Sequence, residues 1–136
     1  TPLYSSAASD VYKRQIGTDI VDIDRIAASL ERLGERFAER VLSVEELRQW
    51  RDKSSSVAFL ARRFAAKEAV SKALGTGIGR GVSFQDIVIT HNAQGAPQVK
   101  LSGGAQAALE AMAASRVLIS LSDERRYAIA YAMAVV

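Results

Sequence analysis

One segment dominates the pattern of hydrophobic and polar positions along the chain. Residues 57–74 are apolar on most sides of a helix. A helix with this pattern is expected at the centre of a domain, in contact with neighbours on several faces. Gly75 follows as a natural stop, because glycine readily adopts the left-handed conformation that ends many helices. The pattern therefore predicts a long central helix at 57–74.

β-Branched and alternating segments on both sides of this helix predict strands. The expected strands are 16–23, 82–90, 98–101, 116–122 and 127–135. The turn sequence Asn92-Ala93-Gln94-Gly95 should join two of them as a hairpin. In the last strand, large apolar residues alternate with alanines, which predicts burial on one side and close packing on the other.

Shorter segments predict the remaining helices. Residues 25–33 should form a helix that breaks at Gly34 and continues as a turn through Val41. Ser43 and Glu46 have the spacing of a capping box, which predicts that another helix starts there. An alanine-rich helix is expected at 103–115. The order of elements predicts an α+β fold, with an antiparallel sheet packed on the long central helix.

Length and composition fit a single domain, expected at 16–136. The chain has 136 residues, of which 49% are hydrophobic and 24% charged. Residues 1–15 lack an initiator methionine and show no clear pattern, so we expect a non-native or disordered leader. A net charge of +3 is too small to indicate nucleic acid binding, and no segment has the ~20 apolar residues of a membrane span. The absence of cysteine excludes thiolate chemistry and suits a cytoplasmic protein.

Two acidic residues stand out because their neighbours are apolar. Asp19 lies in the first strand and either ends it as a helix cap or binds a ligand; Asp22 and Asp24 are better placed to cap the next helix. Glu68 and Lys72 are four residues apart on the central helix. They form either an ordinary surface salt bridge or a partly buried acid beside a cation, which is typical of a functional site.

These residues and the glycine-rich loop 75–81 form a chemical set. Carboxylate oxygens suit Mg²⁺, whose coordination is usually completed by water and substrate phosphates. Lys72 could contact a phosphate, and the backbone amides of the loop could approach an anion closely. The set predicts phosphoryl-type chemistry but names no substrate.

Four arginines would fall close to one helical face if the helix continued past Gly34: Arg25, Arg32, Arg36 and Arg40. Glutamates are interleaved with them, so the face is either simply solvated or a docking strip for an acidic partner.

Two motifs resemble a known family. Gly17-Thr18-Asp19-Ile20-Val21 and the segment from Phe64 to Ile78 (FAAKEAVSKALGTGI) are similar to the holo-[acyl-carrier-protein] synthases, the small bacterial type of 4′-phosphopantetheinyl transferase. The resemblance extends over residues 16–136. It implies transfer of 4′-phosphopantetheine from coenzyme A to a serine of apo-acyl carrier protein in fatty acid biosynthesis, with release of 3′,5′-ADP.

The resemblance also implies roles for individual residues. Asp19 and Glu68 match the acids that bind Mg²⁺, with Mn²⁺ as the alternative metal. Glu68 or a water on the metal would take the serine proton, and Lys72 would neutralise or protonate the departing phosphate. The nucleotide site would be lined by Lys67, Ser71, Lys72, Gly75, Thr76, Gly77 and Pro97. Arg25, Arg32 and Arg36 match the helix that docks the acyl carrier protein, and family members are homotrimers with active sites shared between subunits.

The sequence departs from the family pattern in two places. Residues 1–15 replace the short segment that completes the first strand in relatives. Some relatives carry a histidine near Asp123 that contacts coenzyme A; this chain has no histidine there, and Arg125 or Arg126 could substitute. Two other functions stay open: another magnesium-dependent phosphotransferase, or a non-catalytic trimer that binds nucleotide or carrier protein.

Overall fold

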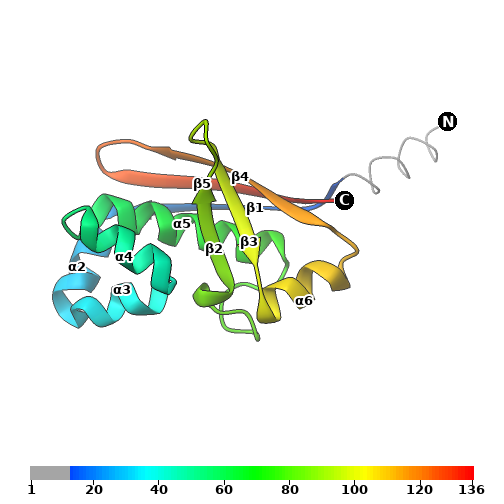
Figure 1. Ribbon diagram of the computed structural model, residues 1–136, viewed down its shortest axis with the longest axis horizontal. Helices are drawn as coiled ribbons and strands as arrows, with labels where there is room; N and C mark the ends of the chain where they lie inside the picture. The colour runs from blue at the N-terminus through cyan, green and yellow to red at the C-terminus, as the bar shows by residue number, and fades with distance from the viewer. Residues whose placement is uncertain (1–12) are drawn as a thin grey trace.

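The long helix α5 (Val57–Ala73) lies at the centre of the structure, a computed structural model that describes residues 13–136 (Figure 1). It packs against strands β1 (Lys13–Asp22) and β5 (Tyr127–Val135), and it also touches β4 (Arg116–Asp123) and β2 (Ile87–His91). The prediction of a central helix with neighbours on several faces is confirmed. No helix of the described part is both long and apolar enough to cross a membrane.

The strands form two antiparallel sheets, and both of them contact α5. The larger sheet has the order β1-β5-β4, and the smaller one pairs β2 with β3 (Pro97–Leu101). Helices α2 (Ile23–Leu33), α3 (Glu35–Val41) and α4 (Val44–Asp52) gather near the N-terminal half of α5, and α6 (Gly103–Ala111) lies at the other end (Figure 1). This arrangement confirms the α+β class predicted from the sequence.

The alternation in β5 separates two unlike faces of the larger sheet. The alanines of β5 face α5 and are fully buried, so helix and sheet can approach closely. The large side chains point the other way, where they join apolar residues of β1 and β4. Five exposed members define this outer face: Ile16, Ile20, Leu118, Ile129 and Tyr131. Close packing on the alanine side is therefore confirmed, whereas within one chain the outer face is not buried.

The predicted helix ends have the expected caps. The Asp22 carboxylate accepts a hydrogen bond from the backbone N–H of Asp24 at 2.9 Å, which starts α2. Gly34 separates α2 from α3 with a φ of 68°, where a side chain would be strained. Ser43 and Glu46 form both hydrogen bonds of the capping box at the start of α4.

Three predicted boundaries were wrong. Strand β1 begins at Lys13 and so includes the last residues of the expected leader; residues 1–12 lie outside the described part. The strand expected at 82–90 starts at Ile87, because Phe84–Asp86 form a 3₁₀ turn in which the Asp86 carboxylate accepts from the N–H of Ser83. Helix α6 ends at Ala111 and not at 115, since the chain turns at Ala113 with a φ of 59°.

Candidate active site

Strand β1 meets helix α5 at Gly17. A Cβ atom at this position would lie 2.2 Å from the carbonyl oxygen of Ala69 and 2.6 Å from the backbone nitrogen of Ala73. Those distances are impossible for a real side chain, so this crossing requires glycine. Asp19 follows two residues later on the same side of the strand, which brings its carboxylate to the surface of α5 that carries Glu68 and Lys72.

The Lys72 ammonium binds the strand directly. It donates to the Asp19 carboxylate at 3.1 Å and to the carbonyl oxygen of Thr18 at 2.9 Å. In the described part of the chain, Lys72 therefore pairs with Asp19 across 53 residues of sequence and not with Glu68 on its own helix. The ammonium is about half exposed, while the Asp19 side chain is only 16% exposed. Asp19 and Lys72 line a cavity of about 510 Å³ with Thr18, Ile20 and Ile129.

Glu68 completes the group of charges. Its pKa is raised from the ordinary value, first by burial and then by the nearby charge of Asp19, while Lys72 and Arg25 act in the opposite direction. The two carboxylates are thus close enough to repel each other. A cation placed between them would relieve that repulsion, and two carboxylates are a suitable donor set for Mg²⁺. The residues present therefore fit a magnesium ion, with Asp19 and Glu68 as its protein ligands.

Two residues expected to line a nucleotide site lie inside the protein instead. Lys67 is completely buried, and its ammonium donates to the Glu46 carboxylate at 2.6 Å and to the carbonyl oxygens of Val41 and Phe84. Burial lowers the pKa of Lys67, and the Glu46 carboxylate opposes this shift. Ser71 is also fully buried, and its hydroxyl donates to the carbonyl oxygen of Glu68. The nucleotide-contact role expected for both side chains is inconsistent with these positions.

The glycine-rich loop follows directly after α5. Gly75, Gly77, Gly79 and Gly81 all have positive φ, so the loop depends on glycine. The backbone N–H of Gly75 donates to the carbonyl oxygen of Lys72, and those of Thr76 and Gly77 donate to that of Ser71. These three amides are bonded to carbonyl oxygens at the end of the helix. They are therefore not free to bind an anion, although the sequence suggested that the loop amides could do so. Pro97, the other expected nucleotide contact, begins β3 opposite His91.

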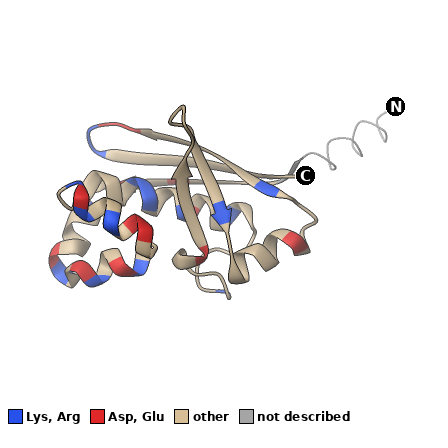
Figure 2. Cartoon of the chain, viewed as in Figure 1, with Lys and Arg blue, Asp and Glu red and all other residues tan. Residues whose placement is uncertain are grey.

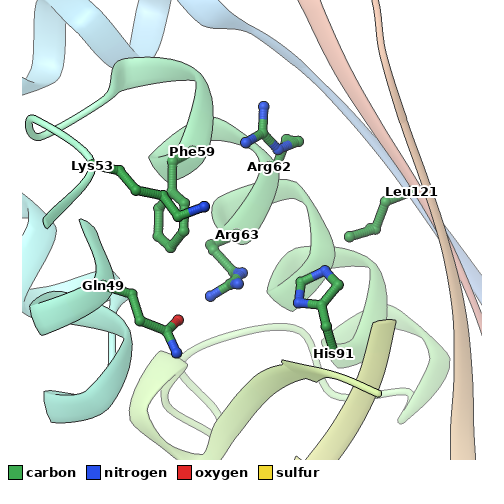
Figure 3. Close-up of a pocket in the computed structure, with 7 residues that line it drawn as sticks. All are labelled: Gln49, Lys53, Phe59, Arg62, Arg63, His91 and Leu121. Carbon is green, nitrogen blue, oxygen red and sulfur yellow. The ribbon is translucent and has the colours of Figure 1, made fainter. Parts of the chain in front are cut away.

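A second cavity, which the sequence analysis missed, lies along the N-terminal half of α5. Its volume is about 460 Å³, and it is lined by Gln49, Lys53, Phe59, Arg62, Arg63, His91 and Leu121 (Figure 3). Four of these seven side chains carry or can carry a positive charge. The sequence signal was the adjacent pair Arg62-Arg63 in the apolar first half of the central helix; Arg63 is five residues before Glu68. We call this space the basic cavity.

Arg63 extends into the basic cavity from its buried wall (Figure 3). The residue is only 6% exposed, and its Nη1 atom lies 3.5 Å from Glu46 Oε2 without a hydrogen-bond partner among the described residues. Burial lowers its pKa, and the charge of Glu46 acts against that shift. The pKa of His91 is lowered by burial and by the cations Arg63, Lys53 and Arg62. A cavity in which positive groups repel one another favours an anionic ligand.

The arginines expected to dock a carrier protein lie on two helices. Arg25 and Arg32 are exposed on α2, and Arg36 is exposed on α3. Because the chain breaks at Gly34, they do not form the continuous helical strip that the sequence suggested. Arg25 is close enough to Glu68 to lower the pKa of that carboxyl, so it borders the acidic pair. Figure 2 shows charged residues concentrated on these helices and sparse on the strands.

The region near Asp123 is held by two surface ion pairs. Arg62 lies 3.4 Å from the Asp123 carboxylate, and Arg126 lies 3.3 Å from that of Asp22 at the start of α2. Arg126 thus links the β4–β5 turn to the start of α2. Arg62 also lines the basic cavity, so its ion pair with Asp123 lies at the edge of that cavity.

A sequence profile of the 4′-phosphopantetheinyl transferase superfamily matches residues 15–132. The chain belongs to this superfamily. A holo-[acyl-carrier-protein] synthase of Shewanella frigidimarina is 56% identical over 115 residues, which cover 85% of this chain and 91% of that protein. The resemblance inferred from the two motifs is confirmed, and with it the prediction of a transferase.

Solved structures of 4′-phosphopantetheinyl transferases share the fold. The holo-[acyl-carrier-protein] synthase of Neisseria meningitidis has a TM-score of 0.84 at 43% identity, over 90% of this chain and 98% of that one. That of Helicobacter pylori, in complex with coenzyme A, has a TM-score of 0.76 at 37% identity, over 88% of this chain and 98% of its own. Both confirm the α+β class with its antiparallel sheet on a long helix.

Proposed function

We propose that this chain transfers 4′-phosphopantetheine from coenzyme A to a serine of apo-acyl carrier protein, giving holo-acyl carrier protein and 3′,5′-ADP. The observation that carries this proposal is the convergence of Asp19, Glu68 and Lys72 from two distant segments, beside a cavity that Asp19 and Lys72 line. Relatives about half identical to the chain are holo-[acyl-carrier-protein] synthases, and one neighbouring structure holds coenzyme A. The absence of cysteine suits the reducing cytoplasm, where we place the protein.

Asp19 and Glu68 would hold Mg²⁺ in this proposal. When bound, the ion would neutralise the pyrophosphate of coenzyme A and make its phosphorus easier to attack. Lys72 supports the assignment, since its ammonium already pairs with Asp19 where positive charge is favourable. The Asp19 carboxylate would then bind both the Lys72 ammonium and the metal ion, at the place where β1 crosses α5.

The reaction needs one proton to leave the serine and positive charge at the leaving group. As the serine oxygen bonds to the β-phosphorus, the bond from that phosphorus to the bridging oxygen breaks and 3′,5′-ADP departs. Glu68 would accept the serine proton as the general base. Lys72, half exposed and one turn further along α5, would neutralise or protonate the departing phosphate.

Coenzyme A carries a third phosphate, on the 3′ position of its ribose, and the basic cavity has the charge to receive it. Arg63 and Glu68 are five residues apart on α5, about 7.5 Å along the helix axis at the usual rise per residue. They also lie about 140° apart around the helix, so one nucleotide would have to pass around α5 to reach both places. The proposed nucleotide site therefore contains Lys53, Arg63 and His91 in place of Lys67 and Ser71, and keeps Lys72 and Pro97. Gly75, Thr76 and Gly77 would border it, although their backbone amides are already bonded to the end of α5.

The carrier protein and a second copy of the chain would use different surfaces. Arg25 borders the acidic pair and is exposed, so we propose that it docks the carrier protein, with Arg32 and Arg36 further out. The outer face of the larger sheet presents Ile16, Ile20, Leu118, Ile129 and Tyr131 together. An apolar patch of this kind is typical of a subunit interface, which supports the homotrimer.

Intact-mass analysis tests the proposed function. The protein is incubated with coenzyme A, Mg²⁺ and an apo-acyl carrier protein, and the carrier is weighed. A gain of one phosphopantetheine that EDTA abolishes is expected, with Mn²⁺ tested as a replacement. No mass change with several carriers would contradict the proposal and favour a non-catalytic binding role or another phosphotransferase.

A further inference from the structure

The guanidinium of Arg63 is held from two sides. Its Cζ atom lies 4.4 Å from the centre of the Phe59 ring, four residues earlier on α5. Its Nη1 atom faces the buried carboxylate of Glu46 at 3.5 Å, which is too long for a good hydrogen bond. The remaining side of the group faces the basic cavity (Figure 3).

Glu46 has little capacity left for Arg63. One of its oxygens accepts from the Lys67 ammonium at 2.6 Å and from the N–H of Ser43 at 2.9 Å. The other accepts from the N–H of Ile89 at 2.9 Å. A single carboxylate thus faces two buried cations, and the closer of them is Lys67. Glu46 attracts Arg63 but does not fix its direction.

The ring of Phe59 constrains the direction of the Arg63 guanidinium. A guanidinium stacks over the face of an aromatic ring, and the attraction grows as the pair is removed from water. Phe59 is buried and lines the basic cavity beside Arg63, and the Lys53 ammonium also lies over its ring at 5.9 Å. One ring therefore contacts two of the cations that give the cavity its charge.

We propose that Phe59 is a positioning residue for coenzyme A: its ring holds the Arg63 guanidinium toward the basic cavity and thereby sets the affinity for the ligand's 3′-phosphate. This inference rests on the proposed function. Phe59 does not touch the reacting atoms, so it acts on nucleotide binding and not on the chemical step.

The test compares two substitutions at the same position. Phe59→Leu keeps an apolar side chain but removes the ring, whereas Phe59→Tyr keeps the ring and can direct its hydroxyl into the cavity. Binding of 3′,5′-ADP and of 5′-AMP, which lacks the 3′-phosphate, is measured by calorimetry on the full chain. We expect Phe59→Leu to weaken 3′,5′-ADP about fivefold with 5′-AMP unchanged, and Phe59→Tyr to match the wild type.

Steady-state kinetics provides a second measurement. Phe59→Leu should raise the KM for coenzyme A by a similar factor and leave kcat and the KM for carrier protein unchanged. Phe84→Leu is the matched control, because Phe84 is also buried but stacks on Phe64, and no cation of the described residues lies over its ring. It should lower the melting temperature without changing the ratio of the two nucleotide affinities.

Several outcomes would overturn the inference. Equal weakening of 3′,5′-ADP and 5′-AMP would mean that Phe59 is only structural, as would equal losses in Phe59→Leu and Phe59→Tyr. In a double-mutant cycle, the effect of Phe59→Leu must become much smaller once Arg63→Met is present, with only the weaker contact of the ring with Lys53 left. Fully independent effects would also refute the inference. If Phe59→Leu does not fold, Phe59→Met is measured in its place. A wild-type chain that never transfers phosphopantetheine would instead refute the proposed function.

Discussion

Lys67 and Glu68 are adjacent in the sequence, yet they belong to two charge clusters with opposite properties. Lys67 points into the core, where its ammonium donates to Glu46 and to two backbone carbonyl oxygens. Glu68 points to the surface, where it lies near Asp19 and its pKa is raised. One helical step of about 100° separates a fully paired charge from one that has no ion-pair partner among residues 13–136.

One of these clusters stabilises the fold, and the other has the charges that a reaction needs. The buried cluster of Glu46 and Lys67 ties α4, α5 and β2 together through hydrogen bonds that use most of its donors and acceptors. The surface cluster of Asp19, Glu68 and Lys72 leaves two carboxylates close together with one ammonium. A site that must bind a metal and phosphate keeps unpaired charge available, whereas a buried charge without partners would unfold the protein.

The largest effect should come from removing either acid of the surface cluster. Asp19→Ala and Glu68→Ala should each reduce phosphopantetheine transfer about 10²–10³-fold or more, because each would delete a metal ligand. Both variants should stay folded. Glu68→Ala should keep its melting temperature or gain slightly, since a repelling carboxylate is gone, whereas Asp19→Ala should lose slightly, because it also removes the ion pair with Lys72. Transfer is followed by intact mass and folding by circular dichroism.

Asp24→Ala is the control for those variants. Asp24 is an exposed acid on the first turn of α2, near the same site but outside the pair. It should retain nearly full activity. If Asp19→Ala or Glu68→Ala unfolds, the two acids stabilise the fold, and the surface cluster does not differ from the buried cluster in this respect.

Substituting the two lysines of α5 compares the clusters directly. Lys67→Met leaves the Glu46 carboxylate buried without its main partner and should lower the free energy of unfolding by about 3–5 kcal/mol. Lys72→Met removes a half-exposed ion pair and should lower it by less than about 1 kcal/mol, while transfer activity falls strongly. Urea denaturation measures the first quantity. Similar stability losses in the two variants would contradict the assignment.

Much of the surface cluster could be predicted from the sequence. Asp19 and Glu68 were recognisable because an acid in an apolar strand or helix row lacks a local partner. The capping box at Ser43 and Glu46 was visible from its spacing, and so was the stop at Gly75. Such signals are local, and local patterns survive folding unless long-range contacts oppose them.

The buried cluster could not be predicted in the same way. Glu46 caps α4 and also binds Lys67 and Ile89, which are 21 and 43 residues away. The family motif contains both Lys67 and Glu68, and the motif alone does not say which of them faces the core. The basic cavity was missed for the same reason. Lys53 comes from the turn after α4, Arg63 from α5 and His91 from β2, so only folding brings them together.

The surface beside the acidic pair offers a smaller test. Arg25→Glu reverses a charge on α2 and should raise the KM for an acidic carrier protein about tenfold, because electrostatic complementarity is lost. The KM for coenzyme A should change much less. Arg40→Glu is the control, because Arg40 is also an exposed arginine but is not among the charges that shift the pKa of Glu68. Equal changes in both KM values would mean that Arg25 acts on the active site and not on docking.

The smallest effect concerns the pH dependence of stability. Burial and the charge of Asp19 raise the pKa of Glu68 above its ordinary value of 4.5. Between these two pKa values the folded state binds more protons than the unfolded state, so stability falls as the pH rises through the folded-state pKa. Wild type should therefore lose melting temperature relative to Glu68→Gln across this interval, and Mg²⁺ should reverse part of the loss by binding the ionised carboxylates. Parallel curves for the two proteins would show that the carboxylates do not repel each other, and the surface cluster would then be as well paired as the buried one.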